Sequence, residues 1–499
     1  MAEKLTDPNK PAHEIIEMLE DGDAIRNDGV RLQAANKNPW YVLATIYGEQ
    51  EEGAKLWNYD EELAAKNRRA WNGWFCGELS DEERQDLAQK TRLEPHDLAP
   101  LSKEELDEIR KRFVARMGKG AKLPPNDLKI NFSDTFFSKP FCADNMVYNK
   151  DAEFLCVVFN RSASFYSALF MGYANFESVT FDGDAAFSSA MFAGSSRFCF
   201  AIFRDDVAFN TTTFTGSSTF SEGMFNGFTD FGSAMFVNEV DFYSTTFMDS
   251  VVFSSATFTS SADFDSAIFK YWGVFYRARF SVSVPEFHWA QLHIGCGFST
   301  DDNDQERWPP IKGQVKIGEK QVMVMPTIDQ KQAYTRLRLL MKKSLRPDDE
   351  QFFQRQEMRC KSVLSKWYHK PFYWLYSGLS DYGNSVWRPL FWMFFVMLSG
   401  ALFMLWWQEA FTFLPKESSG FDWTLGLLGE DDPWAKPRQA AGWSISNTVP
   451  FLGFGKLYYG ELAKELAWPL KVAGGVQTLL GYVLLFFFGL GLRNRFRLR

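Results

Sequence analysis

Aromatic residues recur along the middle of the chain with a spacing that matches neither an α-helix nor an ordinary strand. From Phe154 to Phe280 the step between phenylalanines alternates five and six residues without a break, which is a period of 11. Phe132 and Phe137 keep the same phase, so the array is expected to begin near residue 132. A strict period of this kind indicates a repeat architecture.

The phenylalanines of this array are predicted to form one structural ladder, stacked along the axis of the repeat. Its members are Phe154, Phe159, Phe165, Phe170, Phe176, Phe181, Phe187, Phe192, Phe198, Phe203, Phe209, Phe214, Phe220, Phe225, Phe231, Phe236, Phe242, Phe247, Phe253, Phe258, Phe264, Phe269, Phe275 and Phe280.

A small or β-branched residue stands two positions before most of these phenylalanines, as at Ala163, Ala174 and Val240. Alternate side chains of an extended backbone point to the same side, so both positions are expected to face inward. The other positions are mostly Ser, Thr, Asn, Asp and Gly, which favour turns. Each unit is therefore predicted to be a very short strand followed by a corner.

These units resemble the pentapeptide-repeat family, most clearly in SADFDSAIF (261–269) and SSATF (254–258). The resemblance covers roughly residues 132–282 and implies a right-handed, four-sided β-helix. Every second unit departs from five residues, and there an extra residue is expected to bulge one corner. With coils about 4.8 Å apart, nearly seven coils would give a solenoid about 33 Å long.

Residues 1–130 are charged and predict a small helical N-terminal domain. LSDEERQDLAQ (79–89) and LSKEELDEIRKRF (101–113) each place Glu three residues after Ser, the spacing of a capping box at a helix start. The aromatic residues of KNRRAWNGWFCGEL (66–79) would supply its core. LPPND (123–127) marks the boundary with the array.

After the array, the pattern predicts a cap, a linker and a membrane module. The β-helix with its terminal cap is assigned to residues 131–300, since VPEFHWAQLHIGCGF (284–298) breaks the phase. Residues 301–386 read as a helical linker, because apolar positions in AYTRLRLLMKKSL (333–345) fall on one helix face. The membrane module then occupies residues 387–499.

Two uncharged apolar segments, 389–407 and 472–492, are each long enough to cross a bilayer core of about 30 Å as a helix. Trp406 and Trp407 lie near one end of the first segment, where interfacial aromatic belts occur. Four arginines in the closing RNRFRLR predict a cytoplasmic C-terminus, and two spans then place the N-terminus in the cytoplasm as well.

Between the spans, WSISNTVPFLGFGK (443–456) offers a candidate pore loop made of Thr448, Gly453, Phe454 and Gly455. A Gly-aromatic-Gly segment can present backbone carbonyls to an ion, although Pro450 stands where such filters have no proline. An interfacial amphipathic segment is the alternative interpretation. SDYGNSVWRPL (380–390) and the chain's last residues resemble bacterial membrane proteins that combine pentapeptide repeats with two C-terminal spans.

Charge limits the possible partners. The 499 residues carry a formal net charge of −8, which argues against direct binding of nucleic acid. Between Arg204 and Lys270 there is no Lys or Arg, while nine Asp and Glu residues lie there. Some pentapeptide-repeat proteins bind topoisomerases by imitating duplex DNA, so an acidic DNA mimic is one alternative. A carboxylate-rich face that keeps the rod soluble is the other.

The sequence offers no catalytic, cofactor-binding or metal-binding motif, so we predict that the chain is not an enzyme and needs no cofactor. His288, His293 and Cys296 lie close together but lack a fourth ligand. The six cysteines show no paired spacing, which is typical of reduced thiols in a cytosolic compartment.

Together these patterns predict a non-enzymatic scaffold in the bacterial inner membrane, multi-pass, with both termini cytoplasmic. Its expected partners are the lipid bilayer, an unidentified protein and further copies of the same chain as a homo-oligomer. One alternative is a two-span ion channel with the pore loop at 443–456 and the solenoid as its regulatory domain. The other is the acidic DNA mimic that binds a topoisomerase.

Overall fold

The computed structural model describes residues 13–91, 93, 95–300, 304–317, 320–324, 327–411, 435–452 and 467–495. The chain forms two compact units, Met1–Glu357 and Met358–Arg499. The boundary between them falls inside helix α6 (Pro347–Leu364), within the segment predicted as a linker.

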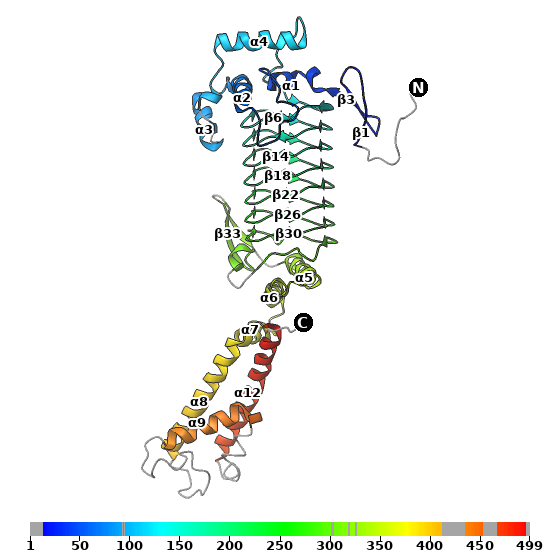
Figure 1. Ribbon diagram of the computed structural model, residues 1–499. Coiled ribbons are helices and arrows are strands. Elements are labelled where there is room, and N and C mark those ends of the chain that lie inside the picture. The colour runs from blue at the N-terminus through cyan, green and yellow to red at the C-terminus, as the bar shows by residue number, and fades with distance from the viewer. Residues whose placement is uncertain are drawn as a thin grey trace. The chain divides into compact units, whose positions relative to one another are not determined.

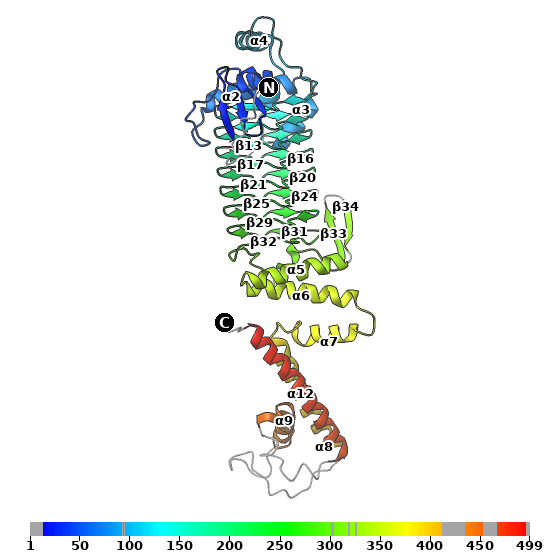
Figure 2. The ribbon, with the colours of Figure 1, turned by 90° about the vertical axis from the view of Figure 1, so that its right-hand side faces the viewer.

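The first unit is dominated by a four-sided β-solenoid whose short parallel strands stack coil upon coil (Figures 1 and 2). Consecutive strands on one side are 22 residues apart, as Ala163 pairs with Ala185, until β29 pairs with β32 at a spacing of 23, Ile268 with Gln291. Each side of the rod is one sheet, and we name each sheet by its first solenoid strand. The predicted fold class is confirmed, with the solenoid, a helical N-terminal region, a helical linker and two long apolar helices.

The β4 sheet contains β4 (Ile130–Asn131), β8 (Ala152–Glu153), β12 (Ala174–Asn175), β16 (Ser196–Arg197), β20 (Ser218–Thr219), β24 (Val240–Asp241) and β28 (Ala262–Asp263). The β5 sheet contains β5 (Thr135–Phe137), β9 (Val158–Phe159), β13 (Thr180–Phe181), β17 (Ile202–Phe203), β21 (Met224–Phe225), β25 (Thr246–Phe247), β29 (Ile268–Phe269) and β32 (Gln291–Leu292). The β6 sheet contains β6 (Phe141–Cys142), β10 (Ala163–Ser164), β14 (Ala185–Ala186), β18 (Val207–Ala208), β22 (Thr229–Asp230), β26 (Val251–Val252) and β30 (Gly273–Val274). The β7 sheet contains β7 (Val147–Tyr148), β11 (Leu169–Phe170), β15 (Met191–Phe192), β19 (Thr213–Phe214), β23 (Met235–Phe236), β27 (Thr257–Phe258) and β31 (Arg279–Phe280).

The ladder phenylalanines fill the interior of the rod, and each of the 24 is at most 2% exposed. Each ring stacks on a ring one coil away: Phe231 is 4.8 Å from Phe209 and 5.0 Å from Phe253 between ring centroids. It also meets Phe220 and Phe242 edge to face, at 5.4 and 5.5 Å. Offset and edge-to-face rings at such distances attract one another, so the aromatic column couples each coil to its neighbours.

The corners of the coil are of two kinds, and they differ from the expected bulge. The corner at 165–168 contains a turn with a left-handed residue, Ser167 at φ 51°, whereas the corner at 171–173 is shorter. The longer corner therefore lies within the five-residue step from Phe165 to Phe170, and not within the six-residue step. The spacing between successive phenylalanines alternates between five and six because the ladder residue takes two different places: Phe170 is the second residue of its strand, while Phe165 follows its strand.

At the first coil, one aromatic residue changes places with its small neighbour. Phe141 occupies an inward position that is small in most other coils, and Ala143 occupies the ladder position; both are fully buried. The Phe141 ring lies 5.1 Å from Phe137 and 5.8 Å from Phe165. The exchange keeps the core volume of the coil, which is the kind of change that a packed interior tolerates best.

The N-terminal region caps the solenoid, and it contains three strands in addition to the predicted helices. An antiparallel meander of β1 (Ile15–Met18), β2 (Ala24–Arg26) and β3 (Arg31–Ala34) joins the β5 sheet, with β3 parallel to β5. The sequence analysis predicted none of these three strands. They continue one side of the rod beyond its first coil (Figure 1).

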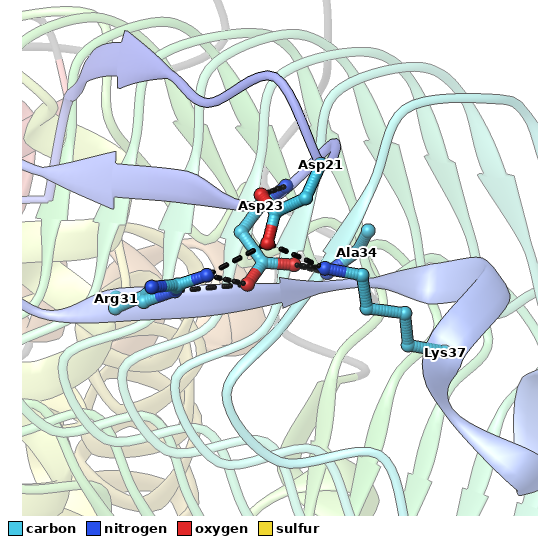
Figure 3. A network of polar contacts seen from close by, with 5 residues as sticks. All are labelled: Asp21, Asp23, Arg31, Ala34 and Lys37. Carbon is cyan, nitrogen blue, oxygen red and sulfur yellow. Dashed lines mark hydrogen bonds and ion pairs between the residues drawn. The ribbon is translucent and has the colours of Figure 1, made fainter.

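Asp23 holds this meander in shape through a network shown in Figure 3. Its carboxylate accepts hydrogen bonds from the Ala34 backbone N–H at 2.8 Å, from Lys37 Nζ at 2.7 Å and from Arg31 Nε at 2.9 Å. Burial would raise the pKa of Asp23, but these hydrogen bonds outweigh it and lower the pKa to about 2. Asp21 binds the same two cations, so the network joins β2, β3 and the turn before helix α1.

Four helices complete the N-terminal cap: α1 (Pro39–Ala44), α2 (Glu61–Cys76), α3 (Asp81–Thr91) and α4 (Lys103–Met117), with the 3-10 turns η1 (Ala35–Lys37) and η2 (Pro95–Leu98). The capping box predicted for α4 is confirmed, since Ser102 and Glu105 bond each other's backbone N–H groups.

Side chains of the cap satisfy the free backbone groups of the first coil. On α2, Trp71 Nε1 donates to the Val147 carbonyl at 3.0 Å, and Asn72 Oδ1 accepts from the Val147 N–H at 2.8 Å. Asn38 Nδ2 donates to the Asn131 carbonyl at 3.1 Å. Unpaired strand edges invite pairing with other chains, so these contacts close the start of the rod.

The other end of the solenoid is closed by aromatic residues. Phe287 and Phe298 continue the ladder after one extra residue has shifted the phase. Their ring centroids lie 4.8 Å from those of Phe264 and Phe275, one coil earlier. Trp308 then covers Phe280 at 5.0 Å and packs on Phe353 of α6, also at 5.0 Å. The remaining elements here are η3 (Asp304–Arg307), the hairpin β33 (Gly313–Ile317) and β34 (Lys320–Val324), and α5 (Ile328–Lys343).

The second unit contains α7 (Lys370–Ser380), α8 (Trp387–Phe411), α9 (Ala435–Thr448), η4 (Pro450–Leu452) and α12 (Trp468–Arg495). In the part of the chain that the structure describes, two helical segments, Trp387–Trp407 and Trp468–Arg495, are long and apolar enough to cross a membrane. Only 11% and 22% of their most apolar windows are buried, whereas a core helix of a soluble protein would be mostly buried.

Candidate functional site

Three polar side chains meet between the long helices of the second unit, and we call Ser444, Thr448 and Gln477 the polar cluster. Gln477 Nε2, on α12, donates to Thr448 Oγ1 at 2.9 Å and to the Ser444 carbonyl at 3.1 Å, and it also bonds Ser444 Oγ. Ser444 Oγ in turn donates to the Met397 carbonyl of α8. The cluster therefore links α8, α9 and α12, which also pack closely on one another.

The contacts of Gln477 show where α9 ends along the two long helices. Gln477 follows the first residue of α12 by nine positions, about 14 Å of helix. Its Nε2 also lies 3.3 Å from the Val396 carbonyl of α8, which is near the middle of the predicted first span. Because α9 ends at Thr448, its C-terminal end lies halfway along the two long helices.

Glycines on the long helices make room for α9. A Cβ at Gly481 of α12 would overlap the Thr448 carbonyl oxygen, and a Cβ at Gly400 of α8 would lie 2.7 Å from both Gln477 Oε1 and Ser444 Oγ. Small residues let helix backbones approach closely inside membranes. The close approach places the last carbonyls of α9, the negative end of its dipole, against α12.

Two buried polar atoms beside the cluster have no hydrogen-bond partner among the residues that the structure describes. They are Gln477 Oε1 and Asn447 Nδ2. Polar groups between apolar helices are costly in a bilayer, so a group of them there is a functional-site hypothesis. The cluster is thus the strongest candidate site in the second unit.

Of the predicted pore residues, Thr448 belongs to the polar cluster and is fully buried. Gly453, Phe454 and Gly455 lie outside the described residues. Gln477 lies within the predicted second span, 472–492, and was not predicted as a site residue. Its partner Ser444 was not predicted, and an i, i+4 pair of hydroxyl residues in 443–456 is the signal that could have found it.

In the solenoid, the predicted ladder residues form a packed core and offer no reactive group. His288, His293 and Cys296 lie in the last coil: His293 Nδ1 accepts from the Gly295 N–H at 3.0 Å, and Cys296 Sγ accepts from the Gly273 N–H at 3.1 Å. Among the described residues, no group of three or more His, Cys, Asp or Glu side chains could hold a metal ion. Burial raises the pKa of Cys76 to about 12, so its thiol is a poor nucleophile.

A cleft of about 550 Å³ opens in the N-terminal cap beside α4. Its charged side chains already have partners: Arg116 Nη2 lies 3.2 Å from Glu49 Oε1, and the Arg112 guanidinium lies over the Tyr47 ring. This pairing suits a structural cleft better than a binding site for a charged ligand.

The outer surface of the solenoid carries three exposed apolar side chains on and beside the corner that follows the β5 sheet. Met224 projects from β21, Phe228 follows it at the next corner, and Met248 lies at the same corner of the following coil; they are 43%, 41% and 42% exposed. We call these three residues the corner patch. Large apolar side chains exposed near one another on a rigid rod are a candidate protein-docking surface.

The acidic residues of the rod include one column in register. Asp241, Asp263 and Glu286 face one another on consecutive coils of the β4 sheet. The pKa of Asp263 is raised to about 6 by burial and by the charges of Asp265, Asp241 and Glu286, while a hydrogen bond from the Asp265 N–H opposes the rise. The DNA-mimic hypothesis stays a prediction, since this column does not test it.

Replacing Asp263 by asparagine should stabilise the first unit at pH 8. Because the pKa is raised in the folded state, the contribution of Asp263 to the free energy of unfolding is most favourable below about pH 4. It is lost as the pH rises through about 6. We expect a gain of about 1 kcal/mol or less at pH 8, after screening by solvent, and no gain below pH 4. Thermal unfolding across this pH range measures both.

Asp230→Asn is the matched control for that substitution. Asp230 accepts the same kind of hydrogen bond, from the Gly232 N–H at 2.7 Å, but its register neighbours Ala208 and Val252 carry no charge. An equal gain at pH 8 in both variants would contradict a specific repulsion at Asp263.

Comparison with family models, curated proteins and solved structures finds no match to this chain.

Proposed function

We propose that this protein is a membrane-anchored scaffold of the pentapeptide-repeat type, without enzymatic activity, that presents its solenoid in the cytoplasm of a bacterium for interaction with another protein. The observation that carries the proposal is a rigid rod, closed at both ends and filled by the ladder, in one chain with two apolar helices. Such a rod has a large outer surface and a dry interior, which suits recognition by surface contact.

The charge distribution supports the cytoplasmic assignment. Arg388 precedes the first span, and Arg493, Arg495, Arg497 and Arg499 close the chain, whereas the segment 408–467 between the spans has eight acidic and five basic residues. Positive residues favour the cytoplasmic side of a span. Fusion of a reporter that is active only in the cytoplasm to either terminus tests this orientation.

The scaffold proposal is tested at the corner patch. Full-length protein is purified in mild detergent as the wild type, as the triple variant Met224→Ser, Phe228→Ser, Met248→Ser, and as the control Tyr166→Ser, Met171→Ser, which alters exposed apolar residues on other sides. We expect a stoichiometric protein partner with the wild type and the control and its loss from the triple variant. If all three proteins retain the partner, the docking surface lies elsewhere on the chain. If the wild type purifies without a protein partner, the scaffold proposal is contradicted.

Ion conduction by an oligomer is the second candidate function, because α9 ends halfway along the spans. A helix whose C-terminal end lies at mid-membrane directs its negative dipole toward that depth and favours a cation. In planar bilayers, a cation-selective current that Thr448→Val or Gly455→Ala abolishes would favour the channel over the scaffold.

A further inference from the structure

Helix α7 presents an aromatic face that no described residue of its unit covers. Phe372, Trp374 and Leu375 are 71%, 77% and 48% exposed, and Trp367 just before the helix is 81% exposed. Tyr376, one helical turn after Phe372, is packed instead, since its ring stacks on Phe487 of α12 with centroids 5.5 Å apart. An exposed face this apolar on an amphipathic helix needs a cover.

The contacts of α7 fix it at one end of the two long helices. From α8, Arg388 Nη1 donates to the Ser377 carbonyl at 2.8 Å, and Trp392 Nε1 donates to the Gly378 carbonyl at 3.1 Å. Asn494 of α12 closes the corner after α7, because its Nδ2 donates to the Gly383 carbonyl at 2.9 Å.

The apolar face of α7 therefore lies at the level where the spans begin. Trp387 and Phe391, in the first turns of α8, are 72% and 63% exposed there. The surface that α7 presents thus continues the apolar surface of the spans.

Positive charge gathers around this end of the unit. Lys366 and Lys370 flank the start of α7, and Arg493 lies close enough to Tyr376 to oppose the rise that burial causes in the pKa of that tyrosine. From residue 366 to residue 388 the only acidic side chain is Asp381, which pairs with Arg388 at 3.8 Å. Aromatic residues between basic ones are typical of helices at the surface of an anionic bilayer.

We propose that α7 lies in the headgroup layer of the membrane, with Phe372 and Trp374 among the upper acyl chains and with Lys366 and Lys370 binding anionic phospholipid headgroups. The occupant is lipid because the exposed face continues the span surface and because its flanking charges complement an anionic leaflet. The inference rests on the proposed membrane anchoring and adds to it a lipid class and a place for the helix.

Spin-label accessibility in liposomes tests the depth of α7. Full-length Trp374→Cys protein, labelled with a nitroxide, is compared with Leu402→Cys on α8 and with Trp289→Cys on the solenoid, where the native side chains are 56% and 81% exposed. We expect the label at 374 to be more accessible to oxygen than to a water-soluble nickel complex, as at 402, and the label at 289 to show the reverse.

The outcomes distinguish the placement of α7 in the headgroup layer from the membrane anchoring of the chain. Water-like accessibility at 374, or protection from both reagents as under a second copy of the chain, overturns the placement of α7 if the label at 402 is in lipid. Water-like accessibility at 402 overturns the anchoring itself.

The lipid class is tested by counting phospholipids that remain bound to full-length protein after extraction from vesicles of phosphatidylcholine with one-third phosphatidylglycerol. We expect Lys366→Gln, Lys370→Gln to lower phosphatidylglycerol binding at least tenfold, at about 1 kcal/mol for each charge. Lys119→Gln, Lys122→Gln, which removes the same charge from the N-terminal cap, should leave it unchanged. Equal binding by the two variants would overturn the headgroup assignment.

Discussion

Replacing Phe231 by alanine should lower the free energy of unfolding of the solenoid by about 3 to 5 kcal/mol. The ring is fully buried and contacts four other ladder rings within 5.5 Å of its centroid. A cavity there removes contacts to both neighbouring coils, and in a linear array each coil depends on such neighbours. The rod has no other core that could take over this role.

Thermal unfolding of the full-length protein in detergent, followed by far-ultraviolet circular dichroism, measures the effect. The expected decrease in Tm is about 10 °C. Phe228→Ala is the control, since Phe228 lies three residues earlier in the same coil but is 41% exposed in the corner patch. If the two variants unfold at the same temperature, the ladder does not carry the stability of the rod.

Substituting alanine for Gly481 should disrupt the packing of α9 against α12. The new methyl group would overlap the Thr448 carbonyl oxygen and carbon, and backbone atoms cannot rotate away as a side chain can. Overpacking typically costs about 1 to 3 kcal/mol, and contact with backbone places this site at the upper end. Loss of the polar cluster is expected to follow, because Thr448 would move away from Gln477.

Gly475→Ala, six residues earlier on the same helix, is the control. A Cβ at Gly475 meets no atom within 4 Å, and alanine favours a helix over glycine by about 1 kcal/mol. In a thermal unfolding assay of the detergent-solubilised protein, Gly481→Ala should therefore lower the Tm and Gly475→Ala should raise it. A neutral Gly481→Ala variant would show that α9 does not contact α12 there.

The solenoid could be predicted because its core is periodic. A strand of two residues has almost no propensity of its own, but an unbroken spacing from Phe154 to Phe280 places one inward phenylalanine on every side of each coil. The periodic spacing did not reveal Phe141 as a core residue, because here the large and the small inward residue are exchanged between positions 141 and 143. It did not reveal Phe287, because one inserted residue precedes it. The periodic signal is lost wherever a residue is added or two neighbours compensate each other.

The N-terminal strands could not be predicted because their stability comes from a distant partner. Ile15–Met18 and Ala24–Arg26 are short and flanked by charge, and β3 pairs with a strand that begins at Thr135, about a hundred residues later. The helix starts in the same region were predictable, since a capping box is local. The arrangement of Asp21 and Asp23 around Lys37 likewise depends on the folded meander.

In the second unit, the long helices were predictable from hydropathy alone, while the polar cluster was not. Gln477 and Ser444 are 33 residues apart, and only the tight packing at Gly400 and Gly481 brings α9 between the spans. The candidate site thus depends on two glycines whose role a single sequence does not reveal.

The 11-residue period also gives the rod a two-fold screw relationship, since opposite sides repeat the same corners half a coil apart. Inserting 11 residues in phase would keep every ladder ring stacked, yet it would turn the C-terminal cap by half a revolution relative to the N-terminal cap. Inserting 22 residues would lengthen the rod by about 4.8 Å and leave that orientation unchanged. The same core can therefore be extended in two ways, one that alters only reach and one that also alters which way a docked partner faces.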